Sequence, residues 1–311
     1  YIAIRRPMKT PESGTEVFNT DFRGNGTVEP GYVSGFVTDF AIRHYTLGGS
    51  SAYPNVASRL TGGSYLVASS TAAQSAVQSN LNWDYMNGYY DPASANSTTP
   101  AWMFKRATGF MDVVAYTGNG TAGTAQAHNL GVAPEMMWIK RRDSSGNWVA
   151  LIDDGNGDLY KYQYLQTNEA FATSSSFVTA NDGSSFTLGS NGTVNANNGN
   201  FITYLFATLA GVSKVGSYTG TGADLNVDCG FSAGARFILI KRTDSTGDWY
   251  VWDSVRGIVA GNDPYLLLNS TAAEVTNTDY VDPLSSGFTV TSSAPAALNA
   301  SGGTYIFLAI A

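Results

Sequence analysis

Short apolar runs alternate with polar turns along the whole chain, and helical spacing is almost absent. Residues 236–242 hold a continuous apolar run, typical of a strand covered on both faces. Residues 244–248 supply Asp and Gly for a turn, and residues 249–252 form a second β-prone run, so the two predict a hairpin. Residues 288–291 alternate with period two, as a half-buried strand does.

The same order of elements occurs earlier in the chain. Residues 136–141 match the buried strand, and the tryptophan-led strand follows at 148–151. Lys140 precedes Trp148 by eight residues, and Lys241 precedes Trp249 by the same interval. A third, diverged copy places its buried strand near residues 36–43 and its closing strand at 102–106. Internal repetition on this scale predicts an array of similar domains.

A Tyr-Leu phrase marks each copy. Tyr65 and Tyr265 each begin a segment that continues through Ser-Thr-Ala-Ala, and a weaker version begins at Tyr164. We therefore expect Tyr65, Tyr164 and Tyr265 to occupy equivalent places in three superposable modules. The Ser-Thr-Ala-Ala segments are expected to form at most a single helical turn.

These patterns predict an all-β protein of three tandem antiparallel β-sandwich repeats, jelly-roll-like in character. The repeats are assigned to residues 1–113, 114–212 and 213–311. Residues 209–212 are the whole link between the second and third repeats, which favours a semi-rigid rod of domains. Residues 1–4 look like the closing strand of a further repeat, so we expect the 311 residues to belong to a longer polypeptide.

The composition of the chain excludes several classes of partner and of covalent structure. The formal net charge is −7 and only 13% of residues are charged, which argues against nucleic acid as a partner. The single cysteine, Cys229, excludes an internal disulfide framework. No run approaches 18 apolar residues, so we expect no membrane insertion.

Enzyme signatures are scarce. His44 and His128 are the only histidines, they lie in different copies, and neither has a Ser or Asp motif beside it. Cys229 has no adjacent base and is predicted to be a buried small residue. No pair of acids stands out by its spacing as a glycosidase pair. We therefore expect the chain not to be an enzyme.

One segment resembles a calcium loop. Asp154, Asn156 and Asp158 alternate as oxygen ligands do in such loops. Leu159 takes the place of the usual glycine, and no glutamate follows at the twelfth position. A plain Asp/Asn/Gly turn explains the segment as well, and no other cofactor is expected.

A cluster of aromatic and polar residues has no counterpart in the other copies. Flat rings beside carboxylates and amides suit a sugar, so the segment is the glycan-binding candidate. The alternative is a hairpin that turns at Asn87 and Gly88 and buries its rings in the core. The candidate residues are Trp83, Asp84, Tyr85, Asn87, Tyr89 and Tyr90.

Cations recur at the end of two buried strands, next to the tryptophan turn. They either pair with the nearby Asp143 and Asp244 or stack on tryptophan at a domain or subunit interface. The interface candidates are Arg141, Trp148, Arg242 and Trp249.

Two phrases, at residues 1–18 and 102–120, resemble large virion proteins of marine tailed bacteriophages, a group that includes tail-fibre-like proteins. The resemblance covers nearly the whole chain and brings no catalytic residues. It implies a structural protein of the virion surface, assembled in the host cytoplasm and contacting other virion proteins or a host-surface glycan. It also implies homo-oligomers, with a trimer favoured. The alternatives are a carbohydrate-binding module array, a capsid-decorating or filament-forming subunit, and a polysaccharide depolymerase.

Overall fold

The structure is a computed structural model that describes residues 9–23, 29–49, 52–76, 81–91, 98–153 and 157–311. It is all-β, with 40% of residues in strands and 5% in helices, and its antiparallel sheets remain open. The predicted all-β sandwich class is confirmed. The phrase at residues 1–4, expected to be a closing strand, lies outside the described residues.

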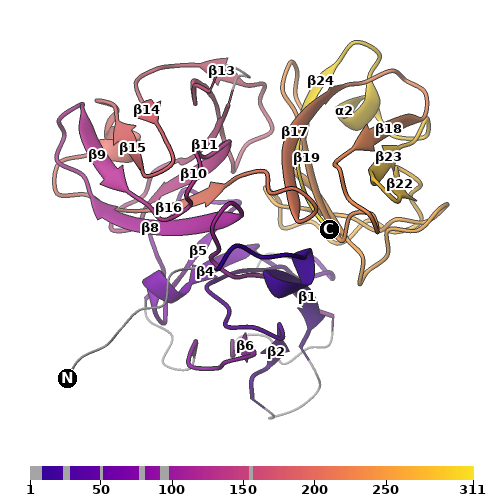
Figure 1. The fold of residues 1–311 in the computed structure, drawn as a ribbon, viewed down its shortest axis with the longest axis horizontal. Coiled ribbons are helices and arrows are strands. Elements are labelled where there is room, and N and C mark those ends of the chain that lie inside the picture. Colours follow the sequence, from indigo (N-terminus) through magenta and orange to yellow (C-terminus); the bar gives the residue numbers. More distant parts are fainter. Residues whose placement is uncertain (1–8, 24–28, 50–51, 77–80, 92–97, 154–156) are drawn as a thin grey trace.

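The first module is built on one five-stranded antiparallel sheet (Figure 1). A two-stranded ribbon of β2 and β6 lies below this sheet in Figure 1, and a 3₁₀ turn, η1 (Gly14–Glu16), precedes the first strand. In order across the sheet, the strands are β1 (Phe18–Phe22), β7 (Pro100–Phe104), β3 (Phe40–Arg43), β4 (Asn55–Ser58) and β5 (Tyr65–Val67), with the ribbon strands β2 (Tyr32–Val33) and β6 (Gly88–Tyr89) and a second 3₁₀ turn, η2 (Arg59–Thr61).

The second module repeats that strand order and adds one strand at the edge. Its main sheet runs β8 (Met111–Thr117), β16 (Asn200–Phe206), β10 (Met136–Arg141), β11 (Trp148–Ile152), β12 (Lys161–Tyr164) and β13 (Ala172–Thr173). Its second layer holds β14 (Val178–Asn181), β15 (Ser185–Leu188) and β9 (Thr124–Ala127), with the one-turn helix α1 (Gly192–Asn195). Because β8 begins at Met111, the second sheet starts three residues before the expected boundary at 114.

The third module has the same order again. Its main sheet runs β17 (Ser213–Thr219), β24 (Thr304–Ile310), β19 (Phe237–Arg242), β20 (Tyr250–Asp253) and β21 (Leu266–Leu267). Its second layer holds β18 (Leu225–Asp228), β23 (Gly287–Val290) and β22 (Val281–Leu284), with the one-turn helix α2 (Ala296–Asn299). Each module is therefore a sandwich whose main sheet has one common topology.

The three main sheets share one apolar core. In β19, Ile238 and Ile240 face the third module's own core, whereas Phe237 and Leu239 face a cluster that also contains Phe104 of the first module and Trp138 of the second. All four β19 residues are buried because both faces of the strand are covered. We call the three-module cluster the shared core.

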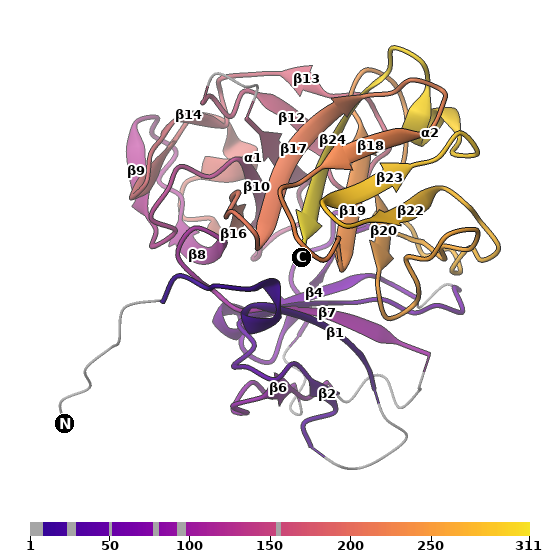
Figure 2. The same ribbon diagram turned by 45° about the vertical axis from the view of Figure 1, so that its right-hand side comes forward.

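The shared core corrects the expected rod. The modules gather as three lobes around a common centre (Figures 1 and 2), and the chain closes on itself where Gly14 of the first module packs against the backbone of Ala311. A rod would expose the apolar outer faces of the main sheets to water, at a cost that scales with the exposed apolar area. Burying them against one another gives a closed arrangement instead.

Hydrogen bonds also correct the expected alignment of the tyrosines. The N–H groups of Ala68, Leu165 and Leu268 donate to the carbonyls of Pro54, Trp148 and Trp249, respectively, which lie at the starts of β4, β11 and β20 or one residue before them. This registers Tyr164 with Val67 and Leu267, two places beyond Tyr65 and Tyr265. The equivalent of those two tyrosines is Tyr162. The Tyr-Leu phrase was misleading here because β12 carries tyrosines at alternate positions, 162 and 164, and Leu165 follows the second of them.

The segments after β5, β12 and β21 hold neighbouring modules together. We call them clasp segments: residues 69–74, 166–171 and 269–274. None of the three contains a helical turn, which is compatible with the expectation of at most one such turn at Ser-Thr-Ala-Ala. The carbonyls of Thr71, Asn168 and Thr271 accept hydrogen bonds from Gly146 N, Gly247 N and Gly49 N at 2.8, 2.9 and 3.1 Å.

A second bond of each clasp comes three residues later. The N–H groups of Gln74, Phe171 and Glu274 donate to the carbonyls of Arg142, Thr243 and Thr46 at 2.9, 2.9 and 2.8 Å. The clasp segment of the first module thus binds the second module, that of the second module binds the third, and that of the third module binds the first. The backbone positions that follow β5, β12 and β21 thus form three equivalent seams between modules, although the second clasp segment lacks the Ser-Thr-Ala-Ala sequence.

Candidate functional site

The predicted glycan cluster is split between core and surface. Trp83 and Tyr89 are only 5% and 1% exposed, and their rings stack on each other at 4.9 Å within the first module's own core. Tyr89 also stacks on Tyr32 at 5.2 Å. Buried rings cannot stack on a sugar, so these two residues are core residues, which is the alternative that the sequence left open.

The other members of this cluster lie nearer the solvent. Asp84 and Asn87 are exposed, and Tyr85 and Tyr90 are half-buried. The Tyr85 hydroxyl donates to the Glu29 carboxylate, and the Arg23 guanidinium lies 5.1 Å from the Tyr90 ring centroid. The segment does double back, because Asn82 and Tyr90 exchange two backbone hydrogen bonds at 2.9 Å, but Gly88 lies in strand β6 and not in a tight turn with Asn87.

The interface candidates divide by residue type. Arg141 and Arg242 pair with Asp143 and Asp244 at 2.8 and 3.0 Å, as the solvated alternative predicted. Arg242 lies over the Tyr305 ring rather than over tryptophan, so the proposed stacking of Arg242 on Trp249 is wrong.

The two tryptophans do lie at an interface between modules. Trp148 and Trp249 are fully buried in the shared core, and Trp148 Nε1 donates across the seam to the Val67 carbonyl at 2.8 Å. The interface is internal to the chain, and the sequence signal for it was the recurrence of tryptophan at the start of a strand.

Two lysines are among the cations that cross the seams, as the interface alternative for the runs 140–142 and 241–242 predicted. Lys140 Nζ donates to the Thr71 carbonyl at 3.2 Å, and Lys241 Nζ donates to the Glu169 carbonyl at 2.7 Å. Both side chains are fully buried, and burial lowers the pKa of each to about 8. Their identical eight-residue spacing to tryptophan was the available signal.

His44 occupies the corresponding place in the first module. Its Nε2 lies 3.1 and 3.2 Å from the carbonyl oxygens of Leu267 and Ser270 in the third module, and Nδ1 lies 3.0 Å from the Tyr45 carbonyl. Burial lowers the pKa of the imidazole from 6.5 to about 4, although these carbonyls act in the opposite direction. The ring is thus a structural group of the seam between the first and third modules.

This placement predicts an acid-sensitive seam. The folded chain keeps His44 neutral down to about pH 4, whereas the unfolded chain protonates it below 6.5. The free energy of unfolding that depends on a neutral His44 is therefore fully present above pH 6.5 and is lost as the pH falls toward and through 4. The loss amounts to up to about 3 kcal/mol. Urea unfolding at pH 7, 5.5 and 4 should show that stability falls more in the native chain than in His44→Gln. Equal pH dependence of the two proteins would contradict this assignment.

The calcium candidate is only partly visible. Asp154 and Asn156 lie outside the described residues, and Asp158 is half-buried. Within the described ranges, no three His, Cys, Asp or Glu side chains gather in a way that would hold a metal ion. In the same ranges, no helix has the length and apolar content needed to cross a bilayer.

The reactive side chains serve packing. Cys229 is buried in the third module's core, and burial raises the pKa of its thiol to about 12. The thiol is therefore protonated at neutral pH, which removes the thiolate that a nucleophile requires. His128 accepts the Leu130 N–H at Nδ1 and contacts the Asp182 carbonyl through Nε2, so it braces a loop of the second module.

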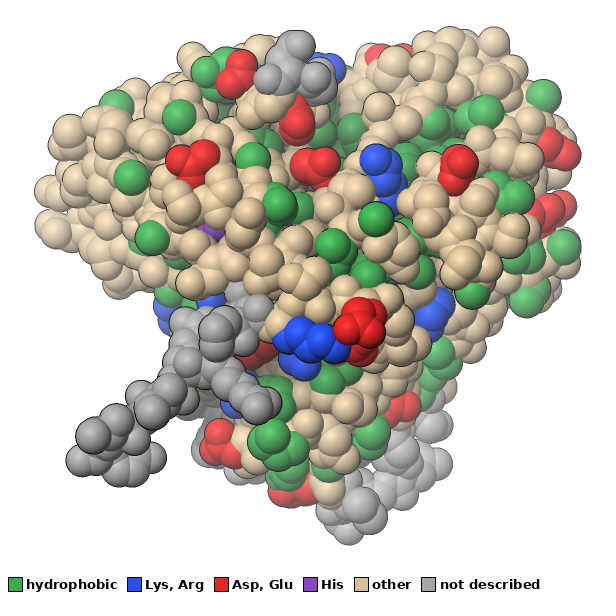
Figure 3. Space-filling model, viewed as in Figure 1, with side chains coloured by type: hydrophobic (Ala, Val, Ile, Leu, Met, Phe, Trp, Pro, Cys, Tyr) green, Lys and Arg blue, Asp and Glu red, His purple; other side chains and the backbone are tan. Residues whose placement is uncertain are grey.

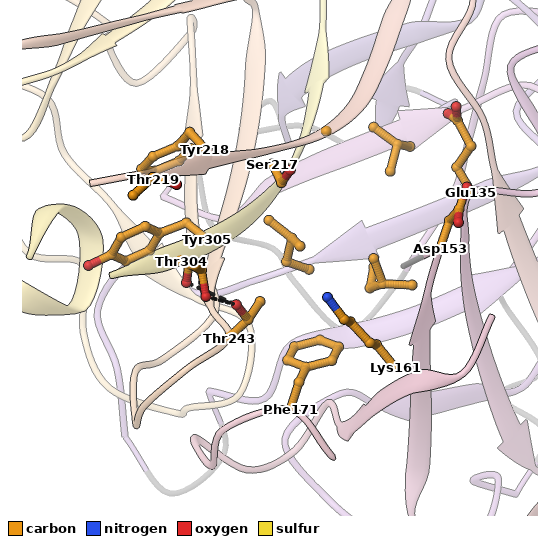
Figure 4. A pocket seen from close by; sticks show the side chains of 14 residues that line it. Glu135, Asp153, Lys161, Phe171, Ser217, Tyr218, Thr219, Thr243, Thr304 and Tyr305 are labelled. Carbon is orange, nitrogen blue, oxygen red and sulfur yellow. Dashed lines mark hydrogen bonds between the residues drawn. The ribbon is translucent and has the colours of Figure 1, made fainter. Parts of the chain in front are cut away.

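A cleft of about 520 Å³ opens in the seam between the second and third modules. One wall carries Lys161 of β12 and Phe171 of the second clasp segment. The opposite wall is formed by β17 and β24, with Ser217 and Thr304 among its hydroxyl groups (Figure 4). Glu135 and Asp153 lie together at one end (Figure 4). The volume falls within the range of about 300–1,000 Å³ that small-molecule sites occupy.

The cleft mixes apolar and hydroxyl surface. Phe171 is half-buried, with its ring centroid 6.2 Å from Trp249 of the shared core, so the ring is held in place from behind. Thr243 and Thr304 bond to each other at 2.6 Å between their hydroxyls. The surrounding face carries mainly uncharged side chains, with charged ones dispersed over it (Figure 3).

Comparison with known proteins places the chain in a family. No curated protein matches its sequence. The model of a domain of unknown function, DUF7483, matches residues 59–311, from η2 of the first module to the end of the third. The matched region therefore omits β1, β3 and β4, although the main sheet of the first module includes them. Because the match covers most of the chain, this protein belongs to the DUF7483 family.

Proposed function

We propose that the chain is a structural protein of a bacteriophage virion surface, tail-fibre-like or part of another appendage. Its task would be to present a rigid surface to a host glycan or to neighbouring virion proteins. The observation that carries this proposal is the use of the repeated residues: the clasp segments and the buried lysines join modules. The residues that recur in this chain thus hold its modules together, and a protein with a mechanical role requires such rigidity.

Immunogold labelling tests the proposal. Antibody against the chain should decorate the outside of purified particles of the phage that encodes it. Label on the tail supports an appendage, label on the head selects a capsid-decorating subunit, and label on free filaments selects a filament-forming one. Particles that carry no label, with all antigen in the soluble fraction of the lysate, would overturn a virion role.

The resemblance also carries the proposal of a homotrimer. The proposal is independent of the three-fold arrangement inside one chain, which results from clasps between its own modules. Sedimentation equilibrium of the purified chain gives the number of copies directly: a mass three times that of the 32.9 kDa chain supports a trimer, and the monomer mass contradicts it.

A further inference from the structure

The three seams are equivalent in backbone but differ in what fills them. The residue whose N–H closes each clasp is Gln74, Phe171 or Glu274. In the seam between the first and second modules, Gln74 Oε1 accepts from Arg142 Nε at 2.6 Å, so the two side chains bridge the modules. This bond occupies the place where the cleft opens in the next seam.

The seam between the third and first modules is also crossed by contacts between side chains. Glu274 Oε1 lies 3.0 Å from Arg256 Nη1, and the Arg256 guanidinium lies 5.6 Å from the Trp102 ring centroid of the first module. Trp102 Nε1 in turn donates to Asp253 of the third module at 2.8 Å. A chain of large side chains therefore spans this seam.

The seam between the second and third modules has a different pair at these positions. Phe171 has no polar atom, and the Thr243 hydroxyl is directed to the Thr304 carbonyl of its own module at 3.0 Å. These two side chains therefore form no polar bridge, and the cleft of about 520 Å³ remains. The clasp's backbone bonds are retained here, but an aromatic ring lies where the other two seams have a polar side chain, Gln74 or Glu274.

The lining defines the chemistry of a ligand. Phe171, Val215 and Ile306 provide apolar surface in the middle of the cleft. Ser217 and Thr219 are exposed on the edge strand β17, with hydroxyls available to donate and accept. A matching ligand has C–H faces and hydroxyls along its rim, which describes a pyranose ring.

The charges favour a neutral sugar. Lys161 is exposed, and it is outnumbered by the Glu135 and Asp153 carboxylates in the same cleft. The carboxylates also make local bonds, Glu135 to Thr208 N at 2.6 Å and Asp153 to Gly157 N at 2.9 Å, which fix their positions. A net negative cleft repels an anionic polysaccharide, whereas each of these groups can bond sugar hydroxyls.

We propose that the cleft between the second and third modules binds a neutral pyranose oligosaccharide, with the Phe171 ring against a sugar face and Ser217, Thr219 and Lys161 bonding its hydroxyls. The proposal deepens the surface-contact function proposed above by naming its ligand class. It is tested on the purified chain, so its failure is distinguishable from failure of the labelling experiment on particles.

The experiment is calorimetric titration of the full chain with neutral gluco-, manno- and galacto-oligosaccharides of three or four rings. Ser217→Trp should fill the cleft and weaken binding by about tenfold or more. Strand register pairs Ser217 with Ile306 and Ala115 with Ile202, so exposed Ala115 is the equivalent position of the second module. Ala115→Trp is thus the matched control and should bind as the native chain does.

A second variant guards against a general folding effect. Lys161→Met removes one hydroxyl-bonding group from an exposed position and should weaken binding without lowering the unfolding temperature. The proposal is overturned if no oligosaccharide of the panel binds the native chain at millimolar concentration, or if Ser217→Trp binds normally. Equal loss in Ala115→Trp would overturn it too.

Discussion

Trp148→Ala is expected to lower the free energy of unfolding by about 4 kcal/mol, in the upper range for removal of a buried aromatic side chain. The indole is fully buried in the shared core and lies 6.2 Å from the Tyr204 ring. Its Nε1 donates to the Val67 carbonyl of the first module. The substitution therefore leaves a cavity where two modules meet and removes one of the hydrogen bonds that the Val67 carbonyl accepts, while the bond from Ser70 N at 3.2 Å remains.

Trp148→Phe separates these two contributions. Phenylalanine keeps most of the apolar volume and removes the hydrogen bond, so we expect a loss of about 1–2 kcal/mol. Urea unfolding followed by circular dichroism and by tryptophan fluorescence gives both values. Because the core is shared, both signals should shift together in one transition. An alanine variant that costs no more than the phenylalanine variant would contradict the assigned packing.

Asp253→Ala should destabilise the chain by about 3 kcal/mol, the lower end of the cost of breaking a buried ion pair, because Arg256 keeps Glu274 as a second partner. Asp253 Oδ2 lies 2.6 Å from Arg256 Nε, and the two side chains are 0% and 2% exposed. The same carboxylate accepts the Trp102 N–H from the first module at 2.8 Å. Removing it therefore breaks an ion pair and a bond across the seam at once.

Asp244→Ala is the matched control for Asp253→Ala. Asp244 also pairs with an arginine close in sequence, Arg242, at 3.0 Å, but its side chain is 39% exposed. An ion pair in water contributes about 0–1 kcal/mol. The two alanine variants should differ by at least about 2 kcal/mol in thermal or urea unfolding. Similar costs would show that Asp253 is not sealed in the seam.

The strands were predictable because their patterns are local. The run expected at residues 236–242 matches β19 (Phe237–Arg242), and the turn after it positions the tryptophan strand. The unbroken apolar run was also a signal that both faces of the strand are covered. Its second partner could not be inferred, because packing of Phe237 against Phe104 joins residues far apart in the chain.

The seams were harder to predict than the strands. Ser-Thr-Ala-Ala looks like a weak helical turn, and its bonds to Gly146 and Gly49 are made by main-chain atoms whose partners no side-chain pattern reveals. The cleft depends on which residue occupies one equivalent position of the three clasp segments: Phe171 in the second, but Gln74 in the first and Glu274 in the third. That difference has meaning only once the register of the three modules is known.

Small-angle X-ray scattering of the purified chain tests the closed arrangement most directly. A compact body of 311 residues should have a radius of gyration of about 20 Å and a single-peaked distance distribution. Three sandwiches in a row would give a clearly larger radius and a long tail in that distribution. The first result is the one that a shared core requires, and the second would contradict it.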